Sequence, residues 1–183
     1  MDTTIEAAAA ILRRGGVVAY PTEGVWGLGC DPHDAAAVAR VFALKRRPAS
    51  TGVLLIGAEF DHVAPYIGTV PEASITRARA GWPGAETWVF PASALVPAWI
   101  RGEHAGIALR VTAHPVASAL CRAYGGALVS TSANRHGEPP LRESDEVRAV
   151  FGTDVDAIVE GALGTSARPT PIRDALSGKT LRD

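Results

Sequence analysis

Amide side chains are nearly missing from this sequence of 183 residues, which has no glutamine and a single asparagine, Asn134. Lysine is also scarce, since Lys45 and Lys179 are the only lysines among 18 basic residues. Alanine, glycine and proline are abundant, a bias typical of a GC-rich genome that replaces lysine and asparagine wherever either is optional. A lysine or asparagine that survives is therefore a candidate for a position that needs its particular shape.

Metal-ligand patterns are missing as well. The two cysteines, Cys30 and Cys121, lie far apart and form no CxxC pair, which favours free thiols in a reducing compartment. The histidines show no metal-ligand spacing with one another or with cysteine or glutamate; they stand at positions 33, 62, 104, 114 and 136. The sequence therefore predicts no structural zinc and no cage of protein ligands around a metal.

Long apolar runs are also absent. None reaches the ~18 residues of a membrane span, and no basic segment precedes an apolar run at the N-terminus, so neither a membrane helix nor a signal peptide is expected. We therefore expect a cytoplasmic protein that does not associate with membranes. The net charge of −1 indicates no nucleic-acid partner from bulk charge, but it leaves room for a local basic groove.

Two common catalytic motifs fail on inspection. Gly178-Lys179-Thr180 resembles the end of a P-loop, but the required earlier glycine is replaced by Arg173, and the segment closes the chain instead of opening a helix. The sequence also has no G-x-S-x-G turn, so a serine hydrolase of that type is excluded.

The pattern of apolar residues predicts one α/β domain over residues 1–183, with a twisted sheet of mixed parallel and antiparallel strands and flanking helices. Hydrophobic residues make up 47% and charged residues 20%, as in a globular protein. Thr3 and Glu6 have capping-box spacing before the first helix, and Asp34 can cap the second. Helices are expected at 7–12, 35–44, 59–67, 71–80, 115–124 and 144–151. Strands are expected at 17–20, 53–56, 86–91, 106–111, 157–159 and 181–182, and in the run that begins at Ala127. The glycines and proline of 21–30 argue against a long regular element there.

The segment from Ala127 to Asn134 is the most unusual stretch. It begins as an apolar strand and ends in three hydroxyls and a carboxamide. Ser130 and Ser132 should share one face of the strand and Thr131 the other. Polar groups at a strand end are where α/β proteins tend to bind ligands, but the same residues could simply form a strand exit with local hydrogen bonds. Both interpretations stay open on the residues alone.

A cationic group follows the second helix at Lys45-Arg46-Arg47-Pro48. Cations at a helix C-terminus are favourable to the helix dipole, which is a purely structural explanation. The functional alternative is phosphate binding by the point charge of Lys45 and the planar fork of Arg47. Pro48 should end the helix and direct both side chains outward.

Further polar groups interrupt apolar strands. Arg110 lies in the apolar run 106–111, and a buried arginine must be paired or must await an anion. Thr22 adds a hydroxyl at a strand end, Thr87 adds one within the strand 86–91, and Thr170 adds one in the extended tail 166–173. With the cations and the serine cluster, they suit an anionic, oxygen-rich ligand such as a nucleotide with a small amino acid. No general base or covalent nucleophile is obvious, which favours catalysis by positioning and charge neutralisation, as in transfer at phosphorus.

Several of these segments, taken in order, resemble the YrdC/Sua5 family. They are Tyr20-Pro21-Thr22-Glu23 with Gly27-Leu28-Gly29, Lys45-x-Arg47-Pro48, Trp82-Pro83-Gly84 with Thr87, Leu109-Arg110-Val111 and Ser130-Thr131-Ser132-Ala133-Asn134. The resemblance runs from about Val17 to the C-terminus, and the length is similar to the short bacterial members. It implies a YrdC-like fold with a concave basic face.

The resemblance also implies an activity, that of a threonylcarbamoyl-AMP synthase. Such an enzyme joins L-threonine, bicarbonate and ATP, with Mg²⁺, into L-threonylcarbamoyladenylate and diphosphate. The product feeds the N6-threonylcarbamoyl modification of adenosine 37 in tRNA through downstream threonylcarbamoyl-transfer proteins. Matched by motif, threonine would contact Thr22, Arg110, Ser130 and Thr170. ATP would contact Lys45, Arg47, Ser132, Asn134 and Arg182, with Lys45 and Arg47 acting in catalysis.

Two alternatives remain at this stage. One is an RNA-binding module that uses the basic face on tRNA or another RNA, although no motif of interleaved aromatic and basic residues supports it. The other is a carbamoyl-adenylate-forming domain of the kind found in larger proteins.

Overall fold

The computed structural model describes residues 3–166 and 170–182. Nine strands in this part of the chain form one sheet in the order β7-β1-β2-β6-β3-β5-β4-β8-β9. The pairs β1–β7, β3–β5 and β4–β8 are parallel and the other five are antiparallel, so the sheet is mixed, as expected. The strands are β1 (Val18–Pro21), β2 (Trp26–Gly29), β3 (Leu54–Gly57), β4 (Thr87–Pro91), β5 (Gly106–Val111), β6 (Leu128–Ser132), β7 (Ala157–Ile158), β8 (Ile172–Asp174) and β9 (Thr180–Arg182).

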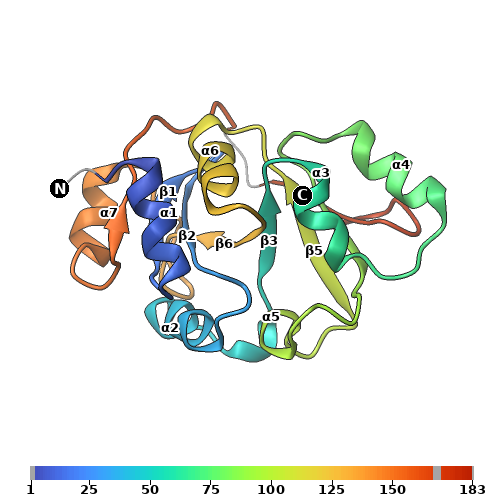
Figure 1. Cartoon of the computed structure of the whole chain (residues 1–183), viewed down its shortest axis with the longest axis horizontal. Coiled ribbons are helices and arrows are strands. Elements are labelled where there is room, and N and C mark those ends of the chain that lie inside the picture. The colour runs from blue at the N-terminus through green and yellow to red at the C-terminus, as the bar shows by residue number, and fades with distance from the viewer. Residues whose placement is uncertain (1–2, 167–169, 183) are drawn as a thin grey trace.

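Helices flank this sheet (Figure 1). They are α1 (Ile5–Arg13), α2 (Ala35–Lys45), α3 (Phe60–Val63), α4 (Glu72–Ala80), α5 (Ala98–Arg101), α6 (Pro115–Tyr124) and α7 (Ser144–Phe151), with 3-10 turns at Ala49–Thr51 and Ala64–Tyr66. In the described part of the chain, no helix combines the length and apolar character needed to cross a membrane. The single domain expected over residues 1–183 stays a prediction.

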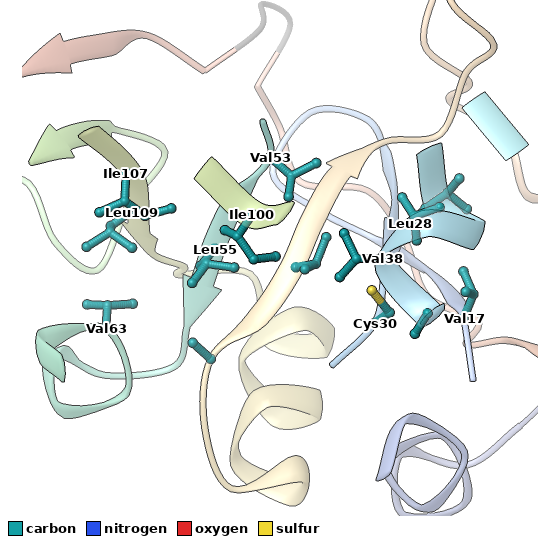
Figure 2. Packing of buried hydrophobic residues seen from close by; sticks show 14 of the residues in the cluster. Val17, Leu28, Cys30, Val38, Val53, Leu55, Val63, Ile100, Ile107 and Leu109 are labelled. Atoms are coloured by element: carbon teal, nitrogen blue, oxygen red, sulfur yellow. The ribbon is translucent and has the colours of Figure 1, made fainter. Parts of the chain in front are cut away.

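Two apolar clusters lie on opposite faces of the sheet, because side chains alternate along each strand. On β3, Ile56 packs with α1 and α6, while its neighbour Leu55 packs in a larger cluster with residues of α2, α3 and α5. Figure 1 shows α1 and α6 in front of the β1, β2 and β6 strands, and Figure 2 shows the larger cluster around Leu55 and Ile100. Strands β1, β3 and β6 therefore have apolar side chains packed on both of their faces.

Helix caps explain two boundaries, one as expected and one not. Asp34 caps α2 by accepting bonds from the backbone of Ala36 and Ala37, as predicted. The cap of α1 is Thr4, whose Oγ1 accepts from Ala7 N at 3.2 Å, so the predicted capping box on Thr3 is wrong by one residue. Adjacent threonines make this shift invisible in the sequence, because each can act as a cap.

Among the elements that were not expected, two are instructive. The first is β2, inside the glycine-rich segment that argued against regular structure. Gly29 explains it, because a Cβ there would lie 2.7 Å from Val129 O and 2.8 Å from the Tyr20 ring, so glycine permits the close approach of β2 to its neighbours. The second is the four-residue helix α5, too short for an apolar period to indicate.

Candidate active site

A cleft of about 710 Å³ opens on the sheet face that α6 covers only in part. Ile56 on β3 and Leu128 on β6 lie under α6, whereas Leu54 and Ser130, two residues away on the same face, line the cleft. The cleft thus begins where the helix layer ends, and its floor is built by rigid strands. Its volume lies within the range of about 300–1,000 Å³ that small-molecule sites occupy.

The charge of this cleft has one sign. Among the described residues that line it are four arginines and one histidine but no aspartate or glutamate. The chain as a whole has 19 acidic residues and a net charge of −1, so the acidic side chains are placed elsewhere. A cleft lined by one sign of charge concentrates ligands of the opposite sign. The arginines are Arg47, Arg101, Arg110 and Arg182, and the histidine is His104.

Arg110 lies at the floor of the cleft and is only 4% exposed. Its Nη1 donates to Thr170 Oγ1 at 3.0 Å, and its Nη2 lies 3.6 Å from Glu23 Oε2. In the described part of the chain, neither Nε of Arg110 nor Oε2 of Glu23 has a hydrogen-bond partner. A buried guanidinium that is only partly satisfied is suited to receive a further anionic group.

Hydroxyls surround this arginine. Ser130, from β6, and Thr22, from the loop after β1, line the same cleft as Thr170. Thr22 Oγ1 donates to Val25 O at 2.7 Å, which closes the loop into a tight turn and fixes the side chain. The structure therefore gathers Thr22, Arg110, Ser130 and Thr170, which lie far apart in the sequence, around one space.

Arg47 lies at the mouth of the cleft and is braced by the turn that follows α2. Its Nε donates to Thr51 Oγ1 at 2.6 Å, and its Nη2 donates to Gly52 O at 3.1 Å. Burial lowers the pKa of Arg47, and the charge of Arg182 lowers it further. Both arginines line the cleft, so their positive charges lie near enough to repel each other.

Two glycines allow close backbone packing at the mouth of the cleft. Gly52 has φ 61° and Gly102 has φ 62°, a region that favours glycine. A Cβ on Gly102 would lie 2.3 Å from Ser50 O, and one on Gly52 would lie 2.7 Å from Arg101 O. The turn that carries Arg47 and the segment that carries Arg101 therefore pack backbone against backbone.

Lys45 does not point outward, as Pro48 led us to expect, but is buried and 3% exposed. Helix α2 already ends at Arg46, in the left-handed region at φ 51°, so Lys45 still projects from the last helical turn toward β6. Its Nζ donates to Ser132 O, to Asn134 O at 3.0 Å and to Asn134 Oδ1 at 2.9 Å. Burial, and then the charge of Arg47, lowers the pKa of Lys45 to about 8.

Asn134 is the centre of this network. Its Oδ1 also accepts from Ser132 Oγ at 2.6 Å, while its Nδ2 donates to Arg135 O at 3.0 Å and Glu138 O at 2.8 Å. Ser132 lines the cleft, but neither Lys45 nor Asn134 is among its lining residues. These two side chains lie beside the cleft and fix the end of β6.

The predicted site residues thus divide into two groups. Those that border the cleft are Thr22, Arg47, Arg110, Ser130, Ser132, Thr170 and Arg182, and those that lie beside it are Lys45 and Asn134. Sequence reasoning missed Arg101 and His104, which reach the cleft from α5 and the following turn. No pattern could have found them, because α5 itself carried no recognisable signal. In the described residues, no group of three or more metal-ligating side chains occurs.

Comparison with known proteins finds chains that are similar over nearly the whole sequence. A Halorhodospira halophila protein named threonylcarbamoyl-AMP synthase is 58% identical to this chain, over 96% of this chain and 92% of that protein. A Coxiella burnetii protein of the same name is 49% identical, over 98% and 96% of the two chains. The crystal structure of P. abyssi Sua5 complexed with L-threonine superposes with a TM-score of 0.88 at 32% identity, over 93% of this chain. This chain spans 50% of that larger protein.

A family model covers nearly the whole sequence. It is the Sua5/YciO/YrdC model, described as telomere recombination, and it matches residues 10–183. The identities of the named relatives extend over almost their full length as well. The mixed sheet and its flanking helices are the fold of the superposed structure. The chain therefore belongs to the Sua5/YciO/YrdC family.

Proposed function

We propose that this protein is a threonylcarbamoyl-AMP synthase, which forms L-threonylcarbamoyladenylate and diphosphate from L-threonine, bicarbonate and ATP. The observation that carries the proposal is the cleft, whose described lining combines four arginines with hydroxyls and has no carboxylate. Such a lining suits a ligand with several anionic groups. The full-length similarity to proteins of this name supports the same activity.

The floor of the cleft would bind threonine. Arg110 offers donors to a carboxylate in the planar geometry that arginine provides. Thr22, Ser130 and Thr170 surround it with hydroxyls that can bond the carboxylate or the hydroxyl of the substrate. The buried position of Arg110 strengthens a bond to an anion, because little water competes there.

The mouth of the cleft would bind the ATP phosphates. Arg47 and Arg182 border it together with the hydroxyl of Ser132. Lys45 and Asn134 would act from beside the cleft, Lys45 by adding positive charge and both by fixing the end of β6 through Ser132. Arg101 adds a further cation at the same mouth.

The chemistry needs little beyond this arrangement. The neutral amine of threonine forms a bond to the carbon of CO₂ and releases a proton, or to the carbon of bicarbonate with loss of water, and either route gives a carbamate. A carbamate oxygen then bonds to the α-phosphorus of ATP, and diphosphate leaves with the electrons of the broken P–O bond. Arg47 and Lys45 would stabilise the charge that builds on this leaving group.

Mg²⁺ would enter with ATP. Magnesium is usually held by substrate phosphates and water with few protein ligands. The described cleft lining, which offers hydroxyls and no carboxylate, fits an ion that the triphosphate carries. The ion would supply charge neutralisation at the phosphates.

The product implies partners of a particular kind. A mixed anhydride of a carbamate and AMP is a reactive acyl donor, so a threonylcarbamoyl-transfer protein must consume it. Its final acceptor would be adenosine 37 of tRNA, which would place the protein in the cytoplasm with its substrates.

The test is ATP-dependent diphosphate formation, with threonine and bicarbonate added together, singly or not at all. The proposal expects diphosphate and adenylate only when both are present. Turnover that does not depend on threonine would contradict it. Turnover with carbamoyl phosphate in place of both substrates would favour a carbamoyl-adenylate-forming domain instead, and a salt-sensitive RNA complex without ATP consumption would favour an RNA-binding module.

A further inference from the structure

Glu23 is the one acidic side chain that the described structure places against the cationic floor of the cleft. It does not line the cleft and is 8% exposed. Its Oε1 accepts a hydrogen bond from Thr112 Oγ1 at 2.5 Å, and its Oε2 lies 3.6 Å from Arg110 Nη2. At this distance Glu23 and Arg110 form an ion pair, but the two atoms are too far apart for a hydrogen bond.

The backbone of Glu23 is held as firmly as its side chain. Its carbonyl oxygen accepts from Ser166 N at 3.0 Å, and a Cβ on Gly164 would lie 2.6 Å from the same oxygen. Thr112, which holds the carboxylate, in turn accepts from His114 N at 3.1 Å, at the start of α6. The carboxylate is thus held by Thr112, which is itself bonded to the start of α6.

The ion pair between Glu23 and Arg110 determines the local charge at the floor of the cleft. Glu23 offsets the charge of Arg110, so a ligand with only a carboxylate is attracted by Arg110 but repelled by Glu23 at this poorly hydrated place. An amino-acid zwitterion brings no net charge. Its ammonium sits on the carbon next to the carboxylate, so the carboxylate can bind Arg110 while the ammonium is attracted to Glu23.

We propose that Glu23 determines the charge specificity of the cleft floor, making it select an amino-acid zwitterion over a simple carboxylate. Glu23 does so through the charge it places beside Arg110, without lining the cleft itself. The inference rests on the proposed function, in which threonine binds at Arg110, and adds the residue that makes this place specific for an amino acid.

A matched pair of ligands tests this inference. L-Threonine and 3-hydroxybutyrate share the carboxylate, the hydroxyl and the methyl group, and differ by the ammonium. Their dissociation constants are measured by calorimetry on the wild-type protein and on Glu23→Gln. In the wild type, 3-hydroxybutyrate should bind at least about tenfold more weakly than threonine. In Glu23→Gln, the dissociation constant of 3-hydroxybutyrate divided by that of threonine should fall by about tenfold or more. The anion is no longer repelled by the carboxylate and binds more tightly, whereas the ammonium of threonine loses its attraction to the carboxylate and threonine binds more weakly.

The ratio of the two dissociation constants distinguishes a change in ligand preference from a general distortion of the cleft. A variant that merely distorts the floor weakens both ligands by a similar factor and leaves the ratio unchanged, which would overturn the inference. The control is Glu160→Gln, which removes the carboxylate that pairs with Arg148 away from the cleft and should leave the ratio as in the wild type. A ratio that shifts equally in this control would also overturn it.

The wild-type measurement can overturn the inference even when Glu23→Gln does not fold. Equal binding of threonine and 3-hydroxybutyrate would overturn the inference alone and leave the proposed function standing. A wild-type protein that binds neither ligand, and forms no diphosphate with threonine, would overturn both.

Discussion

Removing the side chain of Asn134 should cost both stability and activity, and the two losses can be separated. The carboxamide makes four hydrogen bonds: it accepts from Lys45 and Ser132 and donates to the carbonyls of Arg135 and Glu138. Asn134→Ala deletes all four. Lys45 retains two backbone acceptors, but the hydroxyl of Ser132 loses its partner at the edge of the cleft.

The size of the stability loss follows from these bonds. A typical intramolecular hydrogen bond contributes about 0.5–1.5 kcal/mol, and one to a charged group somewhat more. Asn134 is half-buried, so water partly replaces what is lost, and the lower part of the range applies. We expect the free energy of unfolding to fall by about 2–3 kcal/mol, or roughly 5–10 °C in Tm for a chain of this size.

Activity should fall further than folding does. With Ser132 no longer fixed, turnover at a temperature where Asn134→Ala is folded should drop by about tenfold, a loss of about 1.4 kcal/mol in transition-state stabilisation. Calorimetric melting and adenylate formation are measured on the same sample. Turnover that follows only the folded fraction would show that Asn134 is structural. An unchanged Tm would refute the network argument itself.

Asn134→Asp is the matched control. Aspartate keeps an oxygen for Lys45 and Ser132 but replaces the two donors with an acceptor, which sets it against the carbonyls of Arg135 and Glu138. It should therefore lose stability yet keep the bond to Ser132. A variant that loses as much stability as Asn134→Ala, with Ser132-dependent ATP binding retained, would assign the stability to the Nδ2 bonds.

Other expected outcomes are more direct. Turnover should be highest below pH 8 and fall as the pH rises through about 8, where Lys45 loses its proton, and a pH profile of diphosphate release should show this fall shifted upward in Lys45→Arg. Arg110→Lys keeps the charge but loses the planar fork, so steady-state kinetics should show KM rising more for threonine than for ATP. Arg47→Ala should weaken ATP binding in calorimetry by about 1.5–3 kcal/mol. Gly102→Ala places a Cβ 2.3 Å from Ser50 O, so the Tm of this variant should fall by several degrees. The Tm of Gly137→Ala should fall less, because no atom lies within 4 Å of the added Cβ.

Regular elements were predictable where a local pattern carries the signal. The strand 106–111 and the helix 144–151 were predicted at the bounds that the structure has, because an apolar run or an amphipathic period is complete within each. The mixed sheet followed from the alternation of strands and helices. The strand β2 was missed because its cause lies outside it, in Tyr20 and Val129, which leave no room for a side chain at Gly29.

The cleft was predictable as a set of residues but not as a space. The unusual polar groups could be found one by one, since each interrupts an apolar strand or ends one. Their arrangement around the cleft depends on sheet topology, which places β3 between β6 and β5, so that Ser130 on β6 and Arg110 on β5 line the same cleft. The role proposed for Glu23 could not be found in this way, because it depends on a 3.6 Å approach to a residue 87 positions away.

The scarcity of lysine and asparagine indicated some structurally needed positions but not all of the rare residues. Lys45 and Asn134, one of two lysines and the sole asparagine, bond directly to each other and brace the end of β6. Lys179, by contrast, is exposed next to the β8–β9 turn, where its carbonyl accepts from Asp174 N and its side chain makes no bond among those described. The difference is physical: a buried ammonium needs acceptors in fixed places, whereas an exposed one is satisfied by water and can be exchanged for arginine. Rare residue types therefore mark a needed position only where burial fixes the acceptors around them, so Lys45→Arg should lower the Tm more than Lys179→Arg does.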